Sequence, residues 1–232
     1  MTTLRAENVG RDFETDAGAV HAVAEVSLEV RPGELLVITG PSGAGKTTLL
    51  NLLGGLDRPT SGCVRLGETD LSALGDDELA AMRREQLGYV FQSFGLIPVL
   101  SASENVEVPL RLLRMAPAER DARVTEALDA VGLGSHGAQR PYELSGGQQR
   151  RVGIARAIAA RPRLLLADEP TGQLDSSTAA TVMDLIGDLV HERGVAAVVT
   201  THDPAVAGRA DRILELHDGR VRSVSAPAPR GR

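Results

Sequence analysis

The sequence predicts an α/β fold with a mostly parallel sheet, an N-terminal antiparallel β part and an inserted helical subdomain. Short apolar runs at 34–39 and 163–167 are typical of buried parallel strands. Helical periodicity separates such runs, and strand–helix alternation produces a parallel sheet covered on both faces. Between about 72 and 140 helical periodicity dominates, which indicates a helical lobe inserted into the α/β core.

The N-terminal third is expected to contain strands and one helix. Residues 20–30 alternate loosely between apolar and polar side chains, and a Pro-Gly turn separates them from the buried run at 34–39. A glycine-rich loop comes next, followed by a helix over 46–53 that ends at two glycines. Residues 59–67 are expected to form a turn and a short strand.

The rest of the chain divides into a helical middle and an α/β end. The expected elements are helices over 76–86, 101–114, 118–131, 148–160 and 177–192, strands over 88–92, 163–167 and 195–200, and a hairpin of 212–217 and 220–224 that turns at Asp218-Gly219. We expect one domain over 1–224, with an α/β core of about 1–90 and 160–224, a helical lobe of about 95–158, and a disordered Pro- and Ala-rich tail over 225–232.

Composition excludes several classes of protein. The 232 residues carry a net charge of −6, whereas a general nucleic-acid binder needs a basic face, so we expect no nucleic-acid partner. A single cysteine, Cys63, excludes a disulfide framework and a Cys-rich metal site. The sequence has no apolar run of the roughly 18 residues that a membrane span needs, and its N-terminus lacks the apolar core of a signal peptide. We therefore expect a soluble, intracellular-type protein.

A phosphate-binding loop is predicted between the strand at 34–39 and the helix at 46–53. GPSGAGKT matches G-x-x-x-x-G-K-[ST], whose glycines let backbone N–H groups turn toward phosphate oxygens at a helix N-terminus. Lys46, the only lysine among 25 basic residues, is expected to contact the β and γ phosphates, and Thr47 to bind Mg²⁺. The predicted nucleotide-binding residues here are Gly40, Pro41, Ser42, Gly43, Ala44, Gly45, Lys46, Thr47 and Thr48, and the fold is expected to have a P-loop NTPase core.

Two carboxylates follow the apolar run at 163–167. Asp168 and Glu169 are expected at the carboxyl end of a parallel strand, the edge where open α/β sheets bind ligands. Asp168 is the predicted Mg²⁺ ligand, acting through water, and Glu169 the predicted general base for the attacking water. The alternative interpretation is a surface acidic pair that caps the next loop, and the phosphate-binding loop argues against it.

The order of these motifs resembles that of ABC-type ATPases over about residues 3–222. Leu144-Ser145-Gly146-Gly147-Gln148 is similar to the signature motif of that family. The other similar positions, in family order, are Phe13 for the aromatic that stacks on adenine, Gln92 for the Q-loop glutamine, Thr171-Gly172-Gln173-Leu174-Asp175 for the D-loop and His202 for the switch histidine. The resemblance implies catalytic roles for Glu169, His202, Gln92 and Lys46, metal ligation by Thr47, Gln92 and Asp168, and nucleotide contacts from Phe13, Ser145, Gly146, Gly147, Gln148 and Asp175.

Within this family the chain is most similar to the ATPase subunits of lipoprotein-release, macrolide-export and cell-division permeases. GYVFQSFGLIPVLSASENVEVPL and LADEPTGQLDSSTA carry that similarity. Gln173 departs from the group, which more often has Asn or Ala there, and this puts the D-loop contacts in question. Phe13 lacks the hydroxyl of the commoner Tyr, and because stacking accepts any base, selectivity for ATP over GTP is expected to be loose.

The signature motif predicts a second anion site in the same chain. Ser145 is a good N-cap for the helix that follows, and Arg150, Arg151 and Arg156 surround or follow the start of that helix. Two phosphate-binding helix ends are redundant for one nucleotide. The resemblance resolves this: two copies pack head to tail as a homodimer on ATP binding, and each signature motif faces the γ-phosphate held by the other copy.

The resemblance implies an Mg²⁺-dependent ATPase that binds and hydrolyses ATP to power a separately encoded integral-membrane permease. It further implies a place at the cytoplasmic face of the cell membrane, held there by the permease, and a role in export, lipoprotein release or mechanical transmission. We expect the apolar loop 93–98, with Phe94, Leu96 and Ile97, to line a groove for a short helix of the permease; the alternative is that these side chains fill the core between the lobes. A second functional hypothesis is a soluble ABC-type ATPase of DNA repair or chromosome maintenance, which the absence of sustained heptads and the acidic charge disfavour.

Overall fold

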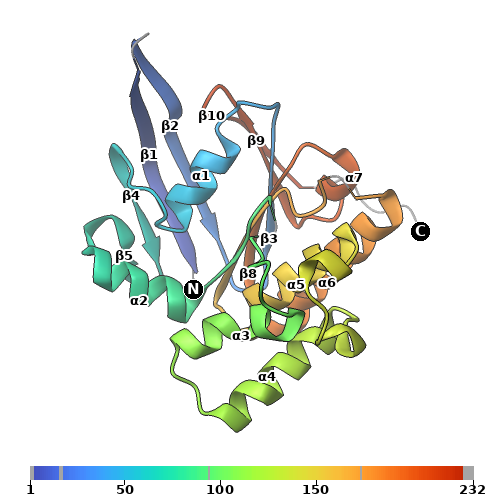
Figure 1. The fold of residues 1–232 in the computed structure, drawn as a ribbon. Helices are drawn as coiled ribbons and strands as arrows, with labels where there is room; N and C mark the ends of the chain where they lie inside the picture. The colour runs from blue at the N-terminus through green and yellow to red at the C-terminus, as the bar shows by residue number, and fades with distance from the viewer. Residues whose placement is uncertain (1–2, 16–17, 94, 173, 227–232) are drawn as a thin grey trace.

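The computed structural model describes residues 3–15, 18–93, 95–172 and 174–226, and two sheets organise the fold (Figure 1). The larger sheet contains, in order across it, β10 (Arg220–Ser225), β9 (Arg212–His217), β3 (Leu35–Thr39), β8 (Ala196–Thr201), β7 (Leu164–Asp168) and β6 (Leu87–Val90). The smaller sheet contains β2 (Gly18–Val30), β1 (Leu4–Thr15), β4 (Ser61–Leu66) and β5 (Thr69–Asp70). Strands β9, β3, β8, β7 and β6 pair in parallel, and β10 and the smaller sheet pair antiparallel. The predicted fold class is confirmed.

Each central strand contributes side chains to two separate cores. Along β3, Leu35 and Val37 enter one apolar cluster, whereas Leu36 and Ile38 enter the other. This is the period-two alternation of a strand whose two faces are both covered. The short apolar runs of the sequence therefore correspond to strands buried on both sides.

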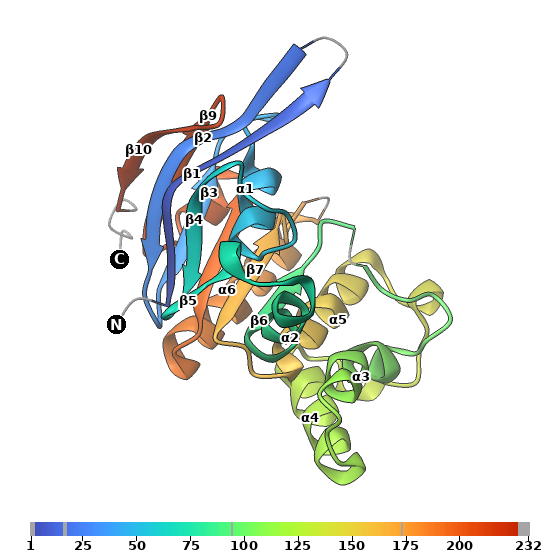
Figure 2. The ribbon, with the colours of Figure 1, turned by 90° about the vertical axis from the view of Figure 1, so that its left-hand side faces the viewer.

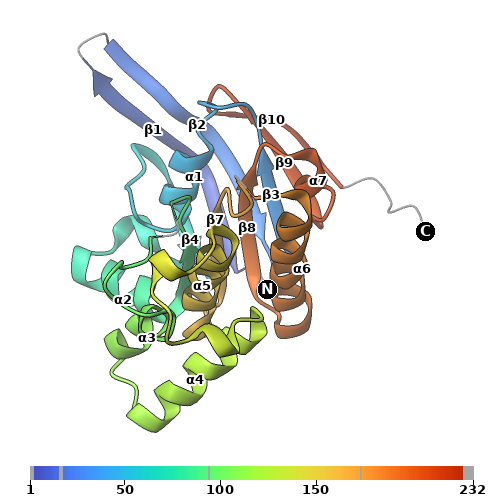
Figure 3. The ribbon, with the colours of Figure 1, turned by 45° about the vertical axis from the view of Figure 1, so that its right-hand side comes forward.

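Helices cover both faces of the larger sheet, as Figures 1 and 2 show. On one side lie α1 (Lys46–Leu53), α2 (Asp76–Gln86) and the antiparallel sheet, and on the other lie α5 (Gly146–Ala159) and α6 (Ser176–Arg193). Helices α3 (Ala102–Leu112) and α4 (Pro117–Ala130) pack against α5 at one end of the molecule (Figure 3). The remaining short helices are α7 (Pro204–Ala207) and the 3₁₀ turns Leu71–Ala73, Gly134–His136 and Pro141–Glu143.

A buried asparagine fixes the loop that enters the helical part. Asn105 is fully buried in α3 and its side chain bonds both the N–H and the C=O of Ile97. The same amide donates to the carbonyls of Leu100 and Ser101. Ser101 also begins α3 in a capping box with Glu104. Residues 97–101 are thus held by side-chain bonds that replace regular secondary structure.

Local signals located most elements, and the differences have physical causes. Helices α1 and α2 have the predicted bounds, whereas α5 begins at Gly146 because Ser145 caps it. The hairpin turn is also as predicted, since Asp218 and Gly219 both have positive φ, of 47° and 73°. Strand β10 continues to Ser225, so the expected disordered tail is wrong at that residue, and 227–232 lie outside the described residues. Helix α7 was not predicted.

The division into an α/β core and a helical lobe stays a prediction. None of the described helices is long and apolar enough to cross a membrane.

Candidate active site

The predicted catalytic residues meet at one edge of the larger sheet. The loop after β3 contains the glycine-rich motif, and Asp168 ends β7 opposite Thr200 of β8. Gln92 follows β6, and His202 follows β8. Because these strands are parallel, their carboxyl ends lie together, which is where an open α/β sheet binds its ligands.

Glycine is required at two positions of the loop between β3 and α1. A Cβ on Gly40 would lie 2.2 Å from the carbonyl oxygen of Leu216, and a Cβ on Gly45 would lie 2.2 Å from that of Ala22. Both residues have positive φ, of 150° and 96°, a region that favours glycine. The loop is therefore pressed against β2 and β9, and its shape depends on these two missing side chains.

The turn of the β9–β10 hairpin supports the same loop. The Gly219 N–H donates to the carbonyl of Ala44 at 3.1 Å, and the Gly219 carbonyl accepts from Ala24 of β2 at 2.8 Å. Gly219 thus connects the phosphate-binding loop to both sheets through backbone bonds.

Lys46 lies inside the curled loop and is only 7% exposed. Its Nζ donates to the carbonyls of Gly40 at 2.8 Å and Pro41 at 2.9 Å. An ammonium has three donors, and these two bonds use two of them. The geometry holds a compact positive charge at the centre of the loop, as an anion-binding site requires.

A chain of hydrogen bonds joins α1, β7 and β8 through Asp168. Thr47 Oγ1 donates to Asp168 Oδ2 at 2.9 Å, and Thr200 Oγ1 donates to Asp168 Oδ1 at 2.6 Å. Asp168 is 5% exposed, so these bonds satisfy a buried carboxylate. A hydroxyl and a carboxylate are the oxygen ligands that Mg²⁺ prefers, and the two side chains already lie together. The residues fit the predicted metal site.

Glu169 adopts a left-handed backbone conformation, with φ 45°. Its N–H donates to both the carbonyl and the hydroxyl of Thr200, at 3.2 and 3.0 Å. Its carboxylate Oε1 lies 3.2 Å from Nδ1 of His202, a largely exposed side chain. Positive φ is uncommon outside glycine and costs conformational energy, and such residues cluster at functional sites. The predicted base and the predicted switch histidine are therefore neighbours.

Two cavities adjoin these residues. One, of about 490 Å³, is lined by Ser42, Gly43, Gly45, Lys46, Thr47, Thr48, Gln92, Glu169, three residues of β2 (Val20, His21 and Ala22) and the Asp218-Gly219 turn. The other, of about 930 Å³, contains Thr47, Gln92, Asp168, Glu169 and His202, together with Tyr89 and Phe91. The structure thus brings Lys46, Thr47, Gln92, Asp168, Glu169 and His202 together. The β2 residues were not predicted, because no local signal marks a strand residue that reaches a loop through tertiary contact.

The signature residues lie apart from these cavities, at the start of α5. Ser145 Oγ accepts from the Gln148 N–H at 3.2 Å, and Gln148 Oε1 accepts from the Ser145 N–H at 2.8 Å. Ser145 and Gly146 are exposed, and a Cβ on Gly146 would meet nothing within 4 Å. A Cβ on Gly147 would lie 3.0 Å from Thr178 Cγ2. The helix start is built, capped and accessible from outside the chain.

The three arginines of α5 do not surround this helix start as the sequence suggested. Arg150 turns inward and donates to the carbonyls of Glu169 and Gln92. Arg151 donates to the Val131 carbonyl at 2.9 Å, and Arg156 donates to the Gly95 carbonyl. A guanidinium has five donors in a fixed fork, which suits it to bonding loop carbonyls. The prediction that basic side chains surround the second anion site is therefore wrong for these three arginines.

Two predicted nucleotide contacts have other partners in the structure. Phe13, on β1, is 37% exposed, and it is not among the described residues that line the two cavities. The Arg11 guanidinium lies over its ring at 4.5 Å. Asp175 caps α6: its carboxylate accepts from the N–H and hydroxyl groups of Ser177 and Thr178, and these bonds hold its pKa below the usual range. Their contacts with a nucleotide stay predictions. Gln173 and Phe94 lie outside the described residues.

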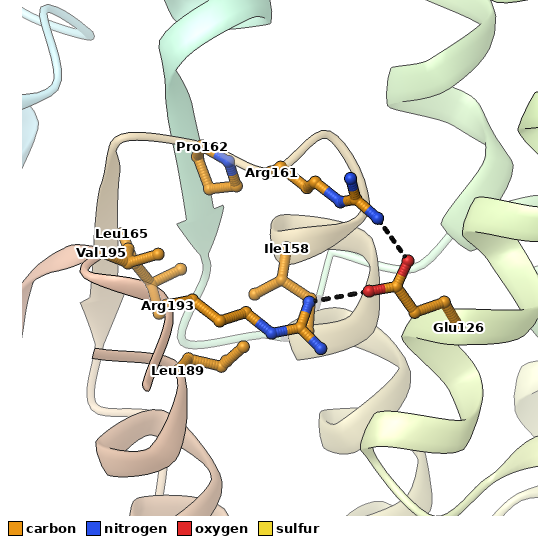
Figure 4. A pocket seen from close by; sticks show the side chains of 8 residues that line it. All are labelled: Glu126, Ile158, Arg161, Pro162, Leu165, Leu189, Arg193 and Val195. Atoms are coloured by element: carbon orange, nitrogen blue, oxygen red, sulfur yellow. Dashed lines mark hydrogen bonds and ion pairs between the residues drawn. The ribbon is translucent and has the colours of Figure 1, made fainter. Parts of the chain in front are cut away.

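A further cavity of about 400 Å³ lies away from the predicted site (Figure 4). Its apolar lining is Ile158, Leu165, Leu189 and Val195, with Pro162 beside them. Glu126 of α4 bonds Arg161 at 2.8 Å and Arg193 at 2.9 Å across its opening. The cavity adjoins the amino ends of β7 and β8, opposite the edge where the predicted catalytic residues meet, and it holds none of the predicted functional residues.

Comparisons with known proteins agree with this geometry. The family model described as ABC transporter matches residues 23–172. The pyoverdine export ATP-binding/permease protein PvdT of Pseudomonas entomophila is 49% identical over 92% of this chain and 33% of its own length. The macrolide export ATP-binding/permease protein MacB of Brucella melitensis is 46% identical over 95% of this chain and 34% of its own length. The chain spans about one third of the curated relatives it matches.

A solved structure matches nearly the whole fold. The ATP-binding cassette MJ0796, in a dimeric post-hydrolysis state bound to ADP and Pi, superposes with a TM-score of 0.91 at 42% identity. The match covers 97% of this chain and 99% of that one.

Proposed function

Since this chain belongs to the ABC transporter family and forms its ATPase domain, we propose that two copies bind ATP between them and hydrolyse it to drive a membrane permease of the export type. The observation that carries the proposal is the meeting of Lys46, Thr47, Asp168 and Glu169 at one sheet edge. A phosphate-binding loop, a metal-binding pair and a base are the parts that phosphoryl transfer to water needs.

Residues of this chain supply the following steps. The loop N–H groups and the Lys46 ammonium bind the phosphates, and the helix dipole of α1 adds positive potential. Glu169 accepts the proton of the attacking water. His202, 3.2 Å from the Glu169 carboxylate, orients that carboxylate and contacts the γ-phosphate.

Thr47 and Asp168 would hold Mg²⁺, with Gln92 as a further ligand. When bound, Mg²⁺ neutralises the charge that develops on the phosphates. One buried carboxylate suits an ion that takes several of its ligands from substrate phosphates and water.

The exposed start of α5 supports a two-copy site. Ser145 and Gly146 point an accessible helix N-terminus outward, and that terminus attracts anions. MJ0796, the similar cassette, forms a dimer in its ADP- and Pi-bound state. We place the signature helix of one copy against the γ-phosphate held by the other, so that ATP closes the dimer and hydrolysis opens it.

The permease is proposed from the relatives, which are ATP-binding/permease export proteins. It would hold the domain at the cytoplasmic face of the membrane. Exposed apolar side chains lie near the Q-loop, at Phe91, Ile97 and Val99, and Leu96 packs partly into the core. These residues form the surface that we assign to a short cytoplasmic helix of the permease. The export relatives favour transport over a role in DNA repair.

The deciding experiment is Glu169→Gln, analysed by size-exclusion chromatography with light scattering. The variant is expected to bind ATP, to lose hydrolysis by about 100-fold or more, and to elute as a dimer with Mg-ATP. The same variant without nucleotide is the control. If it remains monomeric at saturating Mg-ATP, the two-copy site is wrong.

A further inference from the structure

Arg150 connects the signature helix to the catalytic edge of its own chain. Its side chain is 2% exposed. Nη1 donates to the carbonyl of Glu169 at 2.7 Å, and Nη2 donates to the carbonyl of Gln92 at 3.4 Å. The two donors belong to one rigid plane, so they fix the separation of the two carbonyls that they contact.

The backbone of Glu169 needs such support. Its φ of 45° is a conformation that persists only where the surroundings impose it. Thr200 bonds the Glu169 N–H, and Gly172 donates to the Glu169 carbonyl at 3.1 Å. Arg150 donates to the same carbonyl from α5. Thr200, Gly172 and Arg150 thus all bond the backbone of the strained residue, and Arg150 belongs to the signature helix.

The burial of Arg150 has an energetic consequence. Burial lowers the pKa of its guanidinium, and the Glu169 carboxylate raises it in part. An arginine keeps its charge in proteins, so the cation must be satisfied by bonds inside the protein. The carbonyls of Glu169 and Gln92 supply such bonds. The side chain of Arg150 therefore couples its helix to the backbones of Glu169 and Gln92.

We propose that Arg150 is a positioning residue for hydrolysis, which holds Glu169 and Gln92 in register and ties both to the signature helix of the same chain. This inference rests on the proposed function for the reaction it serves. In the head-to-tail dimer, Ser145 of that helix faces the nucleotide of the other copy. Arg150 follows within two turns, so movement of the helix at one nucleotide is transmitted to the base at the other.

The test compares Arg150→Met, Arg150→Lys and Arg151→Met in the full chain. Methionine keeps most of the length and removes the donors. We expect Arg150→Met to lower kcat about 10- to 100-fold, because small displacements of catalytic groups have effects of this size, and to change KM for Mg-ATP by less than about threefold. Lysine restores the charge with a single donor atom, and the kcat of Arg150→Lys is expected to lie between those of the wild type and Arg150→Met. Arg151→Met loses a bond to the helical part and is expected to retain kcat within about twofold.

Two results overturn the proposal. One is a kcat for Arg150→Met equal to that of Arg151→Met; the other is a loss that appears in KM alone. If Arg150→Met does not fold, Arg150→Lys decides, since a wild-type kcat there would assign Arg150 to stability only. An inactive wild-type chain would refute the proposed function instead, and an active wild type with an active Arg150→Met refutes only the role of Arg150.

Discussion

Thr200 Oγ1 donates to Asp168 Oδ1 at 2.6 Å, and both side chains are buried at the sheet edge where the predicted catalytic residues meet. The same hydroxyl accepts from the N–H of Glu169. One threonine therefore orients both the carboxylate proposed to bind the metal and the backbone of the proposed base. No local signal in the sequence marks this role, because it arises where β7 and β8 pair.

Thr200→Val is expected to weaken both stability and catalysis. The change keeps the shape but leaves a buried carboxylate with one bond fewer, which costs about 1–3 kcal/mol. Urea unfolding and an Mg²⁺ titration of ATPase activity measure the two effects. Thr201→Val is the matched control, because Thr201 is equally buried and its hydroxyl accepts from the N–H of Asp203. Identical Mg²⁺ dependence in the two variants would contradict the assignment.

Lys46→Ala is expected to lower ATP affinity about 10- to 100-fold, since a charge-assisted contact to phosphate is lost. Lys46→Arg is expected to lower ATP affinity to a similar extent, because a planar guanidinium does not fit between the carbonyls of Gly40 and Pro41. Binding of a fluorescent ATP analogue measures both. Unchanged affinity in Lys46→Ala would remove Lys46 from the phosphate site.

Gly146→Asp is expected to leave the monomer folded and able to bind ATP but to prevent the ATP-dependent dimer. A side chain at this position enters open space, and an acidic residue in the first turn stabilises its own helix. Its charge then opposes the phosphate of the other copy. Light scattering with Mg-ATP measures the effect. Gly187→Asp, also in open space but on α6, is the control, and equal dimerisation of the two variants would argue against the two-copy site.

Glu126 is expected to stabilise the contact between α4 and the ends of α5 and α6 in a pH-dependent manner. Bonds from Arg161, and secondly from Arg193, lower its pKa below the ordinary 4.5. A lowered pKa in the folded state stabilises the protein above the unfolded pKa, and this stability is lost as the pH falls through the folded value. Because the side chain is 39% exposed, the contribution is about 1 kcal/mol or less.

The measurement is the difference in urea midpoint between wild type and Glu126→Gln at pH 7 and at successively lower pH. The difference is expected at pH 7 and should disappear in acid. Glu119→Gln, which breaks a pair confined to α4, is the control. A difference that grows in acid would have the wrong sign.

The sequence predicted those features that local chemistry controls. The bounds of α1, the turn at Asp218-Gly219 and the cap at Ser145 each depend on residues within a few positions of one another. Motif order predicted the gathering of Lys46, Asp168 and Glu169, because strand–helix alternation brings strand ends to one edge.

Long-range contacts account for what the sequence did not predict. The inward turn of Arg150 and the bonds of Thr200 depend on which segments meet in the fold. Asp175 has, in addition, a local role that was not predicted: its carboxylate accepts bonds from Ser177 and Thr178, and its contact with a nucleotide stays a prediction. A capping pattern two and three residues ahead was the signal that could have identified this role.

The backbone bonds of Gly219 have a practical consequence for engineering. A turn at the end of an exposed hairpin is normally a suitable place to insert a peptide tag or a fluorescent reporter. Here the Gly219 N–H donates to the carbonyl of Ala44 in the phosphate-binding loop, and the Gly219 carbonyl accepts from the N–H of Ala24. An insertion at this turn would therefore deform the phosphate-binding loop.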